Sequence, residues 1–337
     1  MTAVGQREWD AYVEGCPSGT MYHLWGWREV FERGFDHRAI YLAARQGGEI
    51  TGVLPLVQFD HALFGRFLVS LPFVNYGGVL ASNDAAARAL VDHARRLGER
   101  AKSSHVELRH FDQRFPDLQA RRHKVTMLLP LAQSPEAMWE KVDKKVRNQV
   151  RKAQKSELTT EAGGAGLLAE FYDVFCRNMR DLGTPVYGRR FFEEVLRQFP
   201  DRARVFVVRK GTMAVAAGIS LAYHGSIEIP WASSLRDYRT ICPNYLLYWT
   251  MVEFAIARGF EQFDFGRSTP DDGPYHFKKQ WGARAVPLCW EYQLLRAARL
   301  PDRSTKNPKF QAAIAVWQRL PLSLASFVGP RVARYLP

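Results

Sequence analysis

The chain has 337 residues, which is the length of two domains of ordinary size. Its residues are 47% hydrophobic and 24% charged, a balance that excludes a disordered chain, a collagen and a coiled-coil fibre. The 47 lysines and arginines exceed the 34 aspartates and glutamates by 13, so we expect the surface to attract phosphate groups of nucleic acids, nucleotides or anionic lipids.

The chain carries no pattern typical of membrane insertion or of paired cysteines. Residues 1–10 contain three charged side chains and no apolar core, so we expect no secretory signal there. No uncharged apolar run reaches about 18 residues, the minimum for a membrane-spanning helix. The four cysteines lie far apart without a CxxC pair, and we expect reduced, buried thiols in a cytoplasmic protein.

The first half begins with a pattern of strand, tight turn and strand. Residues 39–59 are apolar on both sides of Gly47 and Gly48, which is typical of a hairpin. Three further elements are predicted in the order strand, helix and strand, ending near residue 78, over 86–97 and over 106–109.

The second half repeats this order of elements. Residues 203–223 again predict a strand, a turn at Gly211 and a strand. The matching residues Arg45 and Arg209 lie 164 positions apart. A strand, a helix and a strand follow over 227–231, 243–259 and 263–267. We therefore predict two tandem α/β halves of one topology, with a chance similarity as the alternative.

A basic helix is predicted between the halves, from Trp139 to Lys155. Its apolar positions recur every three or four residues, namely Val142, Val146, Val150 and Ala153. Its other positions are mostly basic, and Lys145, Arg147 and Arg151 are candidates for binding phosphate. The alternative is a solvated helix face. The glycines of 163–166 lack the Lys-Ser/Thr pair of a P-loop, so we expect a linker there.

The densest group of polar and aromatic side chains lies in residues 263–283. A predicted strand leads there into a loop, and such loops at strand ends present polar groups to ligands. Asp264 alternates with two phenylalanines, so its side chain faces away from both. The functional interpretation is a carboxylate that accepts a proton or holds a cation. The alternative is an ion pair with Arg267 or Lys278.

The chain resembles the FemAB family in three segments: FDFGRS with YHFKKQWGA in 263–283, KVRNQVRKA in 145–153 and YHLWGWREVF in 22–31. The resemblance extends from Met21 to Leu294. Within the family, the chain is more similar to FemAB-related proteins associated with exosortase and PEP-CTERM gene clusters. It implies two tandem GNAT-type acyltransferase domains, each a mixed, mostly antiparallel α/β sheet flanked by helices. The expected ranges are 1–138 for the first domain, 139–160 for the basic connecting helix, 161–298 for the second domain and 299–337 for a basic C-terminal tail.

The resemblance also implies the chemistry. Characterised relatives transfer an aminoacyl group from aminoacyl-tRNA to an amine of a peptidoglycan precursor. GNAT enzymes that use acyl-CoA bind its pyrophosphate at a glycine-rich loop before a helix. Here Cys242 and Asn244 fill both glycine positions, and Pro243 lacks an N–H donor. Ordinary acyl-CoA binding is therefore not expected.

Three residues are predicted to be catalytic. Lys278 matches the lysine of the family's FK element, so we expect it to stabilise developing negative charge or to bind a substrate phosphate. Asp264 is expected to orient the amine or take its proton, and Arg267 to bind a phosphate or carboxylate. No Ser-His-Asp or Cys-His pattern is present, so we expect direct attack without a covalent enzyme intermediate.

Further side chains are candidates for contacts with substrate, with a place in the core or in a turn as the alternative. They are Asn75, Tyr76, Tyr187, Trp231, Tyr275, His276 and Trp281. The histidines do not pair at metal-ligand spacing with another ligand type, so we expect no metal site.

The C-terminal stretch differs in character from the rest of the chain. Its apolar residues at helical spacing are Phe310, Ile314 and Trp317, followed by Leu320, Leu322, Leu324 and Phe327. Six basic residues between Arg303 and Arg334 stand against Asp302 alone. We expect peripheral contact with an anionic membrane surface, with packing on the domains as the alternative.

Together these features predict an N-acyl or aminoacyl transferase acting on an amine of a cell-envelope precursor, either peptidoglycan or exopolysaccharide. We expect no bound cofactor, with aminoacyl-tRNA, acyl-CoA or acyl carrier protein as the co-substrate. One alternative is an N-acyltransferase that depends on acyl-CoA or acyl carrier protein. An alternative of another class is a basic nucleic-acid-binding module. The expected location is the cytoplasm, with peripheral binding at the inner face of the cytoplasmic membrane.

Overall fold

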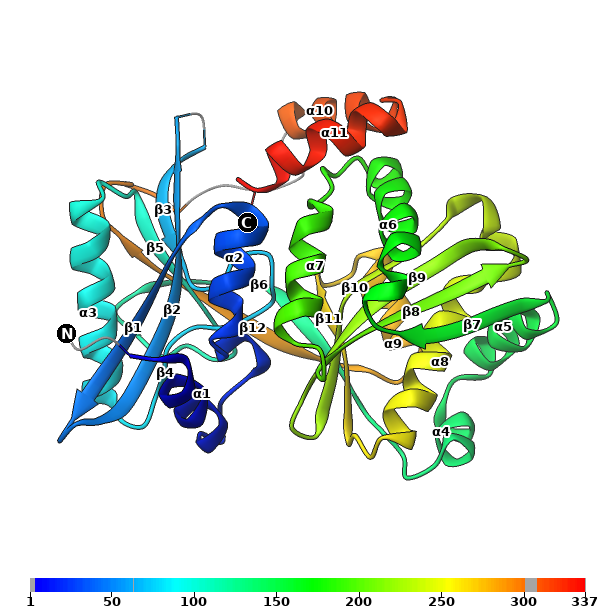
Figure 1. Ribbon diagram of the computed structural model, residues 1–337, viewed down its shortest axis with the longest axis horizontal. Helices are drawn as coiled ribbons and strands as arrows, with labels where there is room; N and C mark the ends of the chain where they lie inside the picture. The colour runs from blue at the N-terminus through cyan, green and yellow to red at the C-terminus, as the bar shows by residue number, and fades with distance from the viewer. Residues whose placement is uncertain (1–3, 63, 301–307, 337) are drawn as a thin grey trace. The chain divides into compact units, whose positions relative to one another are not determined.

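The computed structural model describes residues 4–62, 64–300 and 308–336 (Figure 1). The described chain divides into two compact units, and each unit is built from two separate stretches of chain. Unit 1 contains residues 4–124 and 287–300, apart from residue 63, and unit 2 contains residues 125–286 and 308–336. The ranges expected from the sequence were contiguous, whereas the chain crosses between the compact units more than once.

Unit 1 is built on a sheet in the order β1-β2-β3-β5-β12. The strands are β1 (Arg38–Gln46), β2 (Glu49–His61), β3 (Gly65–Val69), β5 (His105–His110) and β12 (Arg284–Leu294), with the short β4 (Leu80–Ala81) beside β2. The helices are α1 (Gln6–Gly15), η1 (Met21–His23), α2 (Gly26–Phe35) and α3 (Asp84–Arg100). Gly47 and Gly48 both have positive φ, which confirms the predicted tight turn between β1 and β2.

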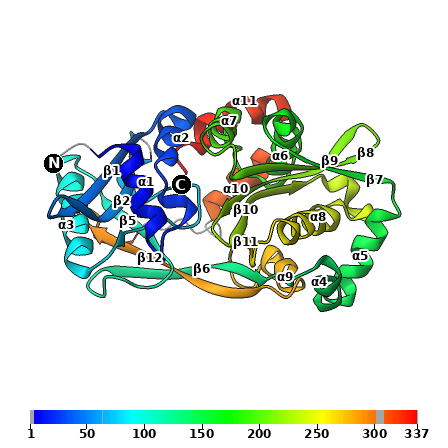
Figure 2. The same cartoon turned by 60° about the horizontal axis from the view of Figure 1, so that its bottom comes forward.

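Unit 2 is built on a sheet in the order β7-β8-β9-β10-β11-β6. Its strands are β6 (Gln119–Pro130), β7 (Leu158–Gly163), β8 (Ala203–Lys210), β9 (Met213–Tyr223), β10 (Ser226–Ser234) and β11 (Gln262–Ser268). Figure 2 shows α6 on one face of this sheet and α8 on the other. The helices are α4 (Pro135–Lys141), α5 (Lys144–Gln154), η2 (Ala165–Leu167), α6 (Leu168–Leu182), α7 (Arg189–Gln198), η3 (Arg236–Ile241), α8 (Pro243–Ala257), α9 (Gly273–Lys279), α10 (Pro308–Gln318) and α11 (Leu322–Ala333).

The internal repeat predicted from the sequence is present in the fold. In each unit a hairpin leads to a third strand, a helix and a strand that pairs in parallel with the third: β1-β2-β3-α3-β5 and β8-β9-β10-α8-β11. An antiparallel strand then flanks the parallel pair, β12 beside β5 and β6 beside β11. The predicted class, a mixed α/β fold with a mostly antiparallel sheet flanked by helices, is confirmed.

The predicted continuous helix from Trp139 to Lys155 is wrong, because it is interrupted after Lys141. The Asp143 carboxylate accepts a hydrogen bond from the backbone N–H of Lys145 at 2.7 Å and begins a new helix, α5. The apolar stripe continues across the interruption, since Val142 and Val146 are both buried. The expected linker is also shorter than predicted, since Gly163 is the last residue of β7.

Candidate functional site

Two parallel strands of unit 2 separate partway along their length. β10 and β11 are paired only from Ser226–Glu228 to Gln262–Asp264. Beyond this point β10 stays paired with β9 as far as Ser234, while β11 stays paired with β6 as far as Ser268. The separation leaves space between the carboxyl-terminal ends of two otherwise rigid strands.

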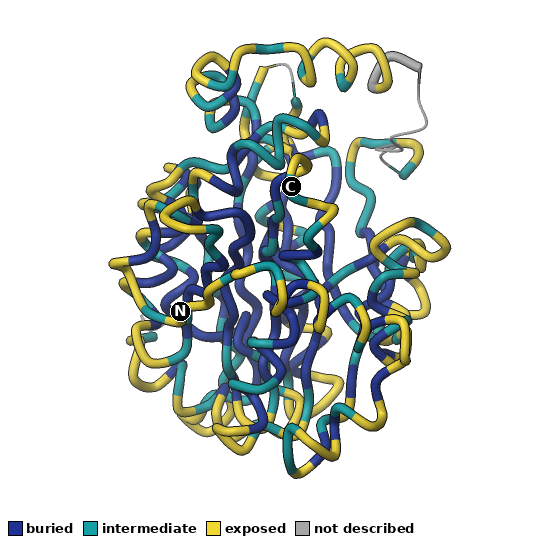
Figure 3. The backbone as a smooth tube through the Cα atoms, turned by 90° about the vertical axis from the view of Figure 1, so that its right-hand side faces the viewer, coloured by how far each residue is buried: buried dark blue, intermediate teal, exposed yellow. Residues whose placement is uncertain are grey.

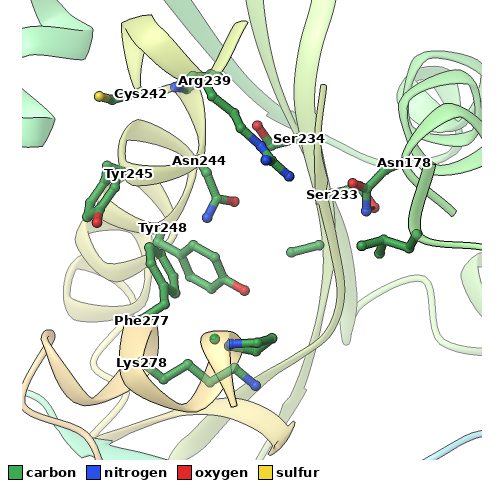
Figure 4. A pocket seen from close by; sticks show the side chains of 15 residues that line it. Asn178, Ser233, Ser234, Arg239, Cys242, Asn244, Tyr245, Tyr248, Phe277 and Lys278 are labelled. Atoms are coloured by element: carbon green, nitrogen blue, oxygen red, sulfur yellow. Dashed lines mark hydrogen bonds between the residues drawn. The ribbon is translucent and has the colours of Figure 1, made fainter. Parts of the chain in front are cut away.

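A pocket of about 510 Å³ lies in unit 2 along the separated end of β10. Figure 4 shows side chains from η3, α8 and α9 on one side of this space and from β10 and α6 on the other. The lining residues are Asn178, Leu182, Ala232, Ser233, Ser234, Arg239, Cys242, Pro243, Asn244, Tyr245, Tyr248, Gly273, Pro274, Phe277 and Lys278.

The ammonium group of Lys278 is held at this pocket by two main-chain carbonyls. Lys278 is 8% exposed, and its Nζ donates hydrogen bonds to the carbonyl oxygens of Gly266 and Arg267, both at 3.0 Å. Gly266 has a φ of 72° at an irregularity in the pairing of β11, a conformation that favours glycine. Asp264 stabilises this turn, because its Oδ1 accepts the Gly266 N–H at 2.7 Å and the Thr126 hydroxyl at 2.6 Å.

The electrostatic environment keeps Lys278 charged at neutral pH. Burial lowers the pKa of Lys278 to about 8, and the carboxylates of Asp264, Asp272 and Glu228 partly oppose that shift. An ammonium group has three N–H donors, and the described residues supply acceptors for two of them. The third N–H is available to a ligand in the pocket.

Further polar side chains, one of them the cationic Arg239, line the same pocket. Figure 4 shows the side chains of Arg239, Asn244 and Tyr248 directed into the space that Lys278 borders. Burial raises the pKa of Tyr248 well above its ordinary value, so its hydroxyl stays protonated and can donate a hydrogen bond. Across the pocket, the Asn178 side-chain amide donates to the Ser233 hydroxyl at 3.0 Å.

The segment that takes the place of a glycine-rich loop has an unusual backbone. Cys242 has a φ of 58°, and Pro243 is the first residue of α8. The Cys242 thiol donates to the side-chain oxygen of Gln149 on α5 at 2.7 Å and is turned away from the pocket (Figure 4). Burial raises the pKa of this thiol, which keeps it protonated. Asn244, rather than Cys242, therefore occupies the space at the start of the helix.

Of the predicted catalytic residues, only Lys278 lines the pocket. Asp264 is 1% exposed, and its Oδ1 accepts hydrogen bonds from the Gly266 main chain and from the Thr126 hydroxyl. Arg267 contributes its carbonyl oxygen to Lys278. Asp264 and Arg267 therefore lie next to Lys278 but do not line the pocket of unit 2.

The predicted substrate-binding residues of unit 2 lie outside the pocket lining. Trp281 is fully buried in the core, and Trp231 packs edge-on against Phe191 and Phe192 on α7. Tyr187 joins the same aromatic cluster. On α9, Tyr275 is half-buried against the core and His276 is exposed. In a sequence, aromatic residues that line a ligand pocket look the same as aromatic residues that fill the core.

The corresponding separation in unit 1 is filled by the chain itself. β3 and β5 form two parallel residue pairs, after which the Ser70 N–H donates to the Glu107 carbonyl at 2.8 Å and the Gly77 N–H donates to the Arg109 carbonyl at 3.2 Å. The buried Arg109 guanidinium holds the same segment through the carbonyl of Val74 at 3.0 Å.

A second, smaller pocket of about 290 Å³ lies in unit 1 beside this segment. Tyr76 lines it, whereas Asn75 is buried outside the lining. The buried side chains of His23 and His110 also border it. Burial lowers the pKa of His23 to about 4, so this ring is neutral at pH 7.

The predicted phosphate-binding residues of α5 differ in exposure, and Arg147 is half-buried. Lys145 and Arg151 are exposed, and Arg151 lies over the ring of Trp139 at 5.4 Å. Arg147 pairs with Glu140 at 3.0 Å. None of the three lines the pocket of unit 2.

Sequence reasoning missed Asn178, Asn244 and Tyr248 as lining residues. Asn244 and Tyr248 are four residues apart, and this spacing puts both on one face of α8. This polar face was not recognised in the sequence, because α8 is apolar on almost all of its faces. No pattern around Asn178 marks it out.

Two features that a sequence can suggest are not found among the described residues. No group of three or more histidine, cysteine, aspartate or glutamate side chains there could hold a metal ion. Within the same residues, no helix combines the length and apolar character needed to cross a membrane.

Known proteins share the fold at low sequence identity. Residues 140–279 match the family described as "Acetyltransferase (GNAT) domain". A structure of FemX matches with a TM-score of 0.66 and 16% identity, over 88% of this chain and 97% of that one. A domain assigned to a lysylphosphatidylglycerol synthetase from Agrobacterium fabrum matches with a TM-score of 0.59 and 12% identity, over 96% and 95%.

A third structure, a tandem GNAT protein from the clavulanic acid biosynthesis pathway, has a TM-score of 0.50 at 12% identity and covers 79% of this chain and 85% of that one. No curated protein matches the sequence. The segment that carries the larger pocket is thus similar to GNAT acetyltransferase domains.

Proposed function

We propose that this protein is an N-acyl or aminoacyl transferase that binds the activated acyl end of its donor in the pocket of unit 2. The observation that supports this most directly is a buried, charged lysine with one spare N–H at the point where two parallel strands separate. A carbonyl group in this pocket meets a fixed positive donor in a site partly shielded from water. Such a donor is most effective where negative charge develops during reaction.

The proposed reaction is direct attack by the amine of the acceptor. A carbon–nitrogen bond forms between the amine and the acyl carbon, and the carbonyl oxygen takes up negative charge, which the spare N–H of Lys278 stabilises. The bond from carbon to the leaving oxygen or sulfur then breaks. The protonated hydroxyl of Tyr248, whose side chain is directed into the pocket, donates a hydrogen bond to that leaving atom, which takes its proton from water or from the attacking amine.

The proton released by the amine has no acceptor of carboxylate or imidazole type among the lining residues. We therefore assign its removal to water or to a group on a substrate. Asp264 acts in this proposal as a positioning residue, because it holds Gly266, whose carbonyl holds Lys278. This replaces the predicted role of Asp264 as a base.

The donor is proposed to be aminoacyl-tRNA, and the acceptor an amine of a cell-envelope precursor. Similarity in fold to FemX and to a lysylphosphatidylglycerol synthetase domain supports aminoacyl transfer. Acyl-CoA or acyl carrier protein is the second candidate donor, favoured by the match to a GNAT acetyltransferase domain. Pro243 and Asn244 at the start of α8 favour the first.

The test is a measurement of donor binding and single-turnover transfer with charged tRNA, uncharged tRNA, acetyl-CoA and long-chain acyl carrier protein at one moderate salt concentration. Lys278→Met is expected to lower the transfer rate about 100-fold or more, the magnitude seen when an oxyanion donor is lost. Lys279→Met is the matched control, since Lys279 is the exposed neighbour, and its rate should stay near that of the wild type.

Each outcome distinguishes the candidates. Selective binding of charged tRNA supports aminoacyl transfer, and binding of a thioester without preference for tRNA supports the second donor. Equal, steeply salt-dependent binding of both tRNAs without transfer would instead indicate a nucleic-acid-binding module.

A further inference from the structure

The C-terminal helix pair, α10 and α11, is part of the surface of unit 2. A Cβ added at Gly183, the residue after α6, would lie 2.5 Å from the side chain of Ile314, and one added at Gly329 would lie 2.9 Å from that of Val186. The Arg180 guanidinium donates to the carbonyl of Leu320 at 3.3 Å. The predicted alternative, packing of this stretch on the domains, therefore describes one side of the pair. Phe310, also part of the predicted stripe, has a side chain outside the described set.

Many residues of the helix pair are exposed (Figure 3). Six large hydrophobic side chains are exposed among the described residues, and four of them belong to this stretch: Val316, Leu324 and Phe327 on the helices, and Leu336 just after α11. Val316 is 62% exposed and Phe327 63%. A fifth, Leu182, ends the helix on which the pair packs. Such a concentration is unusual on a surface exposed to water and marks an interaction site.

The two sides of α11 are segregated by helical spacing. Ala325, Gly329 and Ala333 are buried and recur every four residues. Leu324 and Phe327 occupy the opposite face with Arg331, because these positions are three and four residues apart. The helix therefore buries its small residues and presents its large ones.

The charge of the same surface is entirely positive. Residues 308–336 include four basic residues and no aspartate or glutamate. Arg319 and Arg331 are exposed, and the Arg331 guanidinium lies 4.0 Å from the ring centroid of Phe327. Apolar side chains bordered by cations suit an interface between hydrocarbon and phosphate headgroups.

We infer that the outer face of the C-terminal helix pair docks on a lipid bilayer that contains anionic headgroups. The large apolar side chains enter the headgroup boundary, and the arginines contact lipid phosphates. A protein partner would need an acidic surface, whereas anionic lipid supplies both chemistries at once. Leu182 belongs to this surface and also lines the pocket, so the docking face reaches the edge of the pocket.

Co-sedimentation with vesicles tests this without any turnover, so its result is separate from that of the donor assay. Wild-type protein should bind vesicles of phosphatidylglycerol and phosphatidylcholine at least tenfold more tightly than phosphatidylcholine alone. Leu324→Ser with Phe327→Ser should weaken binding at least tenfold. Arg319→Gln with Arg331→Gln should weaken it by about fivefold for each arginine and only on anionic vesicles.

Two control variants match these changes elsewhere on the surface. Met213→Ser removes another exposed apolar side chain, and Arg7→Gln with Lys102→Gln removes two exposed charges from unit 1. Both should bind like the wild type, and thermal melting checks that each variant is folded. Equal binding to both vesicle types would overturn the inference. So would dimerisation that the Leu324→Ser and Phe327→Ser changes abolish without loss of vesicle binding.

Discussion

The charge of Lys278 is held in place by peptide carbonyls and not by a carboxylate. A carboxylate partner would neutralise the charge of the ammonium group. The two carbonyls carry no net charge, so they fix the position of the ammonium group and leave its positive charge available to a ligand. Asp264 favours the charged form from a distance, since it lowers the electrostatic cost of the buried cation. This arrangement has a consequence for the dependence of activity on pH.

Transfer should require protonated Lys278, so the rate should fall as pH rises through about 8. Asp264→Asn keeps acceptors for Gly266 and Thr126 but removes the negative charge that raises the lysine pKa. The falling limb of kcat/KM against pH should therefore move to lower pH, by about one unit.

Asp271→Asn is the matched control, because Asp271 is exposed and its positive φ is one that asparagine tolerates. Its pH profile should coincide with that of the wild type. A profile that Asp264→Asn leaves unmoved would exclude an electrostatic role for Asp264.

The segment from Ser70 to Val79 is the element that makes the two units differ. In unit 1 it fills the separation between parallel strands, and the equivalent separation in unit 2 holds a pocket. Gly78 lies where this segment presses on His110, since a Cβ there would be 2.1 Å from the imidazole. The side chain of His110 is itself fixed by Glu291 at 2.6 Å.

Gly78→Ala should therefore destabilise the protein by about 1–3 kcal/mol, the range typical of overpacking in a core. Urea unfolding measures the change. Gly15→Ala, where nothing lies within 4 Å of the added Cβ, should change the free energy of unfolding by less than about 0.5 kcal/mol. Equal effects of the two substitutions would contradict the close packing at Gly78.

Local patterns predicted most elements because their causes are local. Gly47–Gly48 and Gly211 give turns, and the apolar spacing of 86–97 gives α3. The interruption of the helix at Asp143 was not predicted, because the apolar stripe continues through it. The N-terminal cap by Asp143 was the signal that could have revealed it, since aspartate is a common first residue before a helix. The buried position of Trp281 could not be predicted, because the same residue types occur in cores and in ligand pockets.

At the scale of the molecule, the sheet of unit 1 depends on a strand from beyond the main stretch of chain that forms this unit. The part of β12 that pairs with β5, Cys289–Leu294, follows the whole of 125–286 along the chain. Glu291 on this strand is fully buried and accepts hydrogen bonds from His110 at 2.6 Å, from the Arg114 N–H at 3.1 Å and from the Phe115 N–H at 2.7 Å. The range expected for the second domain, 161–298, included these residues, because no local pattern in a sequence indicates which sheet a strand joins.

Glu291→Ala should destabilise unit 1 by about 3 kcal/mol, because it leaves buried donors without an acceptor. Hydrogen exchange should accelerate in β5 and leave α8 of unit 2 unchanged. Glu99→Ala removes a glutamate from an exposed pair with Arg95 and should alter neither. Equal acceleration in both units would show that they open together.

The placement of β12 also sets an order of events during synthesis. Residues 4–124 leave the ribosome first, yet their sheet lacks its flanking strand until residue 294 has been made. All six strands of unit 2 are available once Ser268 has emerged. Domains commonly fold as they are translated, the N-terminal one first. In this chain the second unit can complete its sheet before the first, and the nascent N-terminal stretch must stay soluble in the meantime.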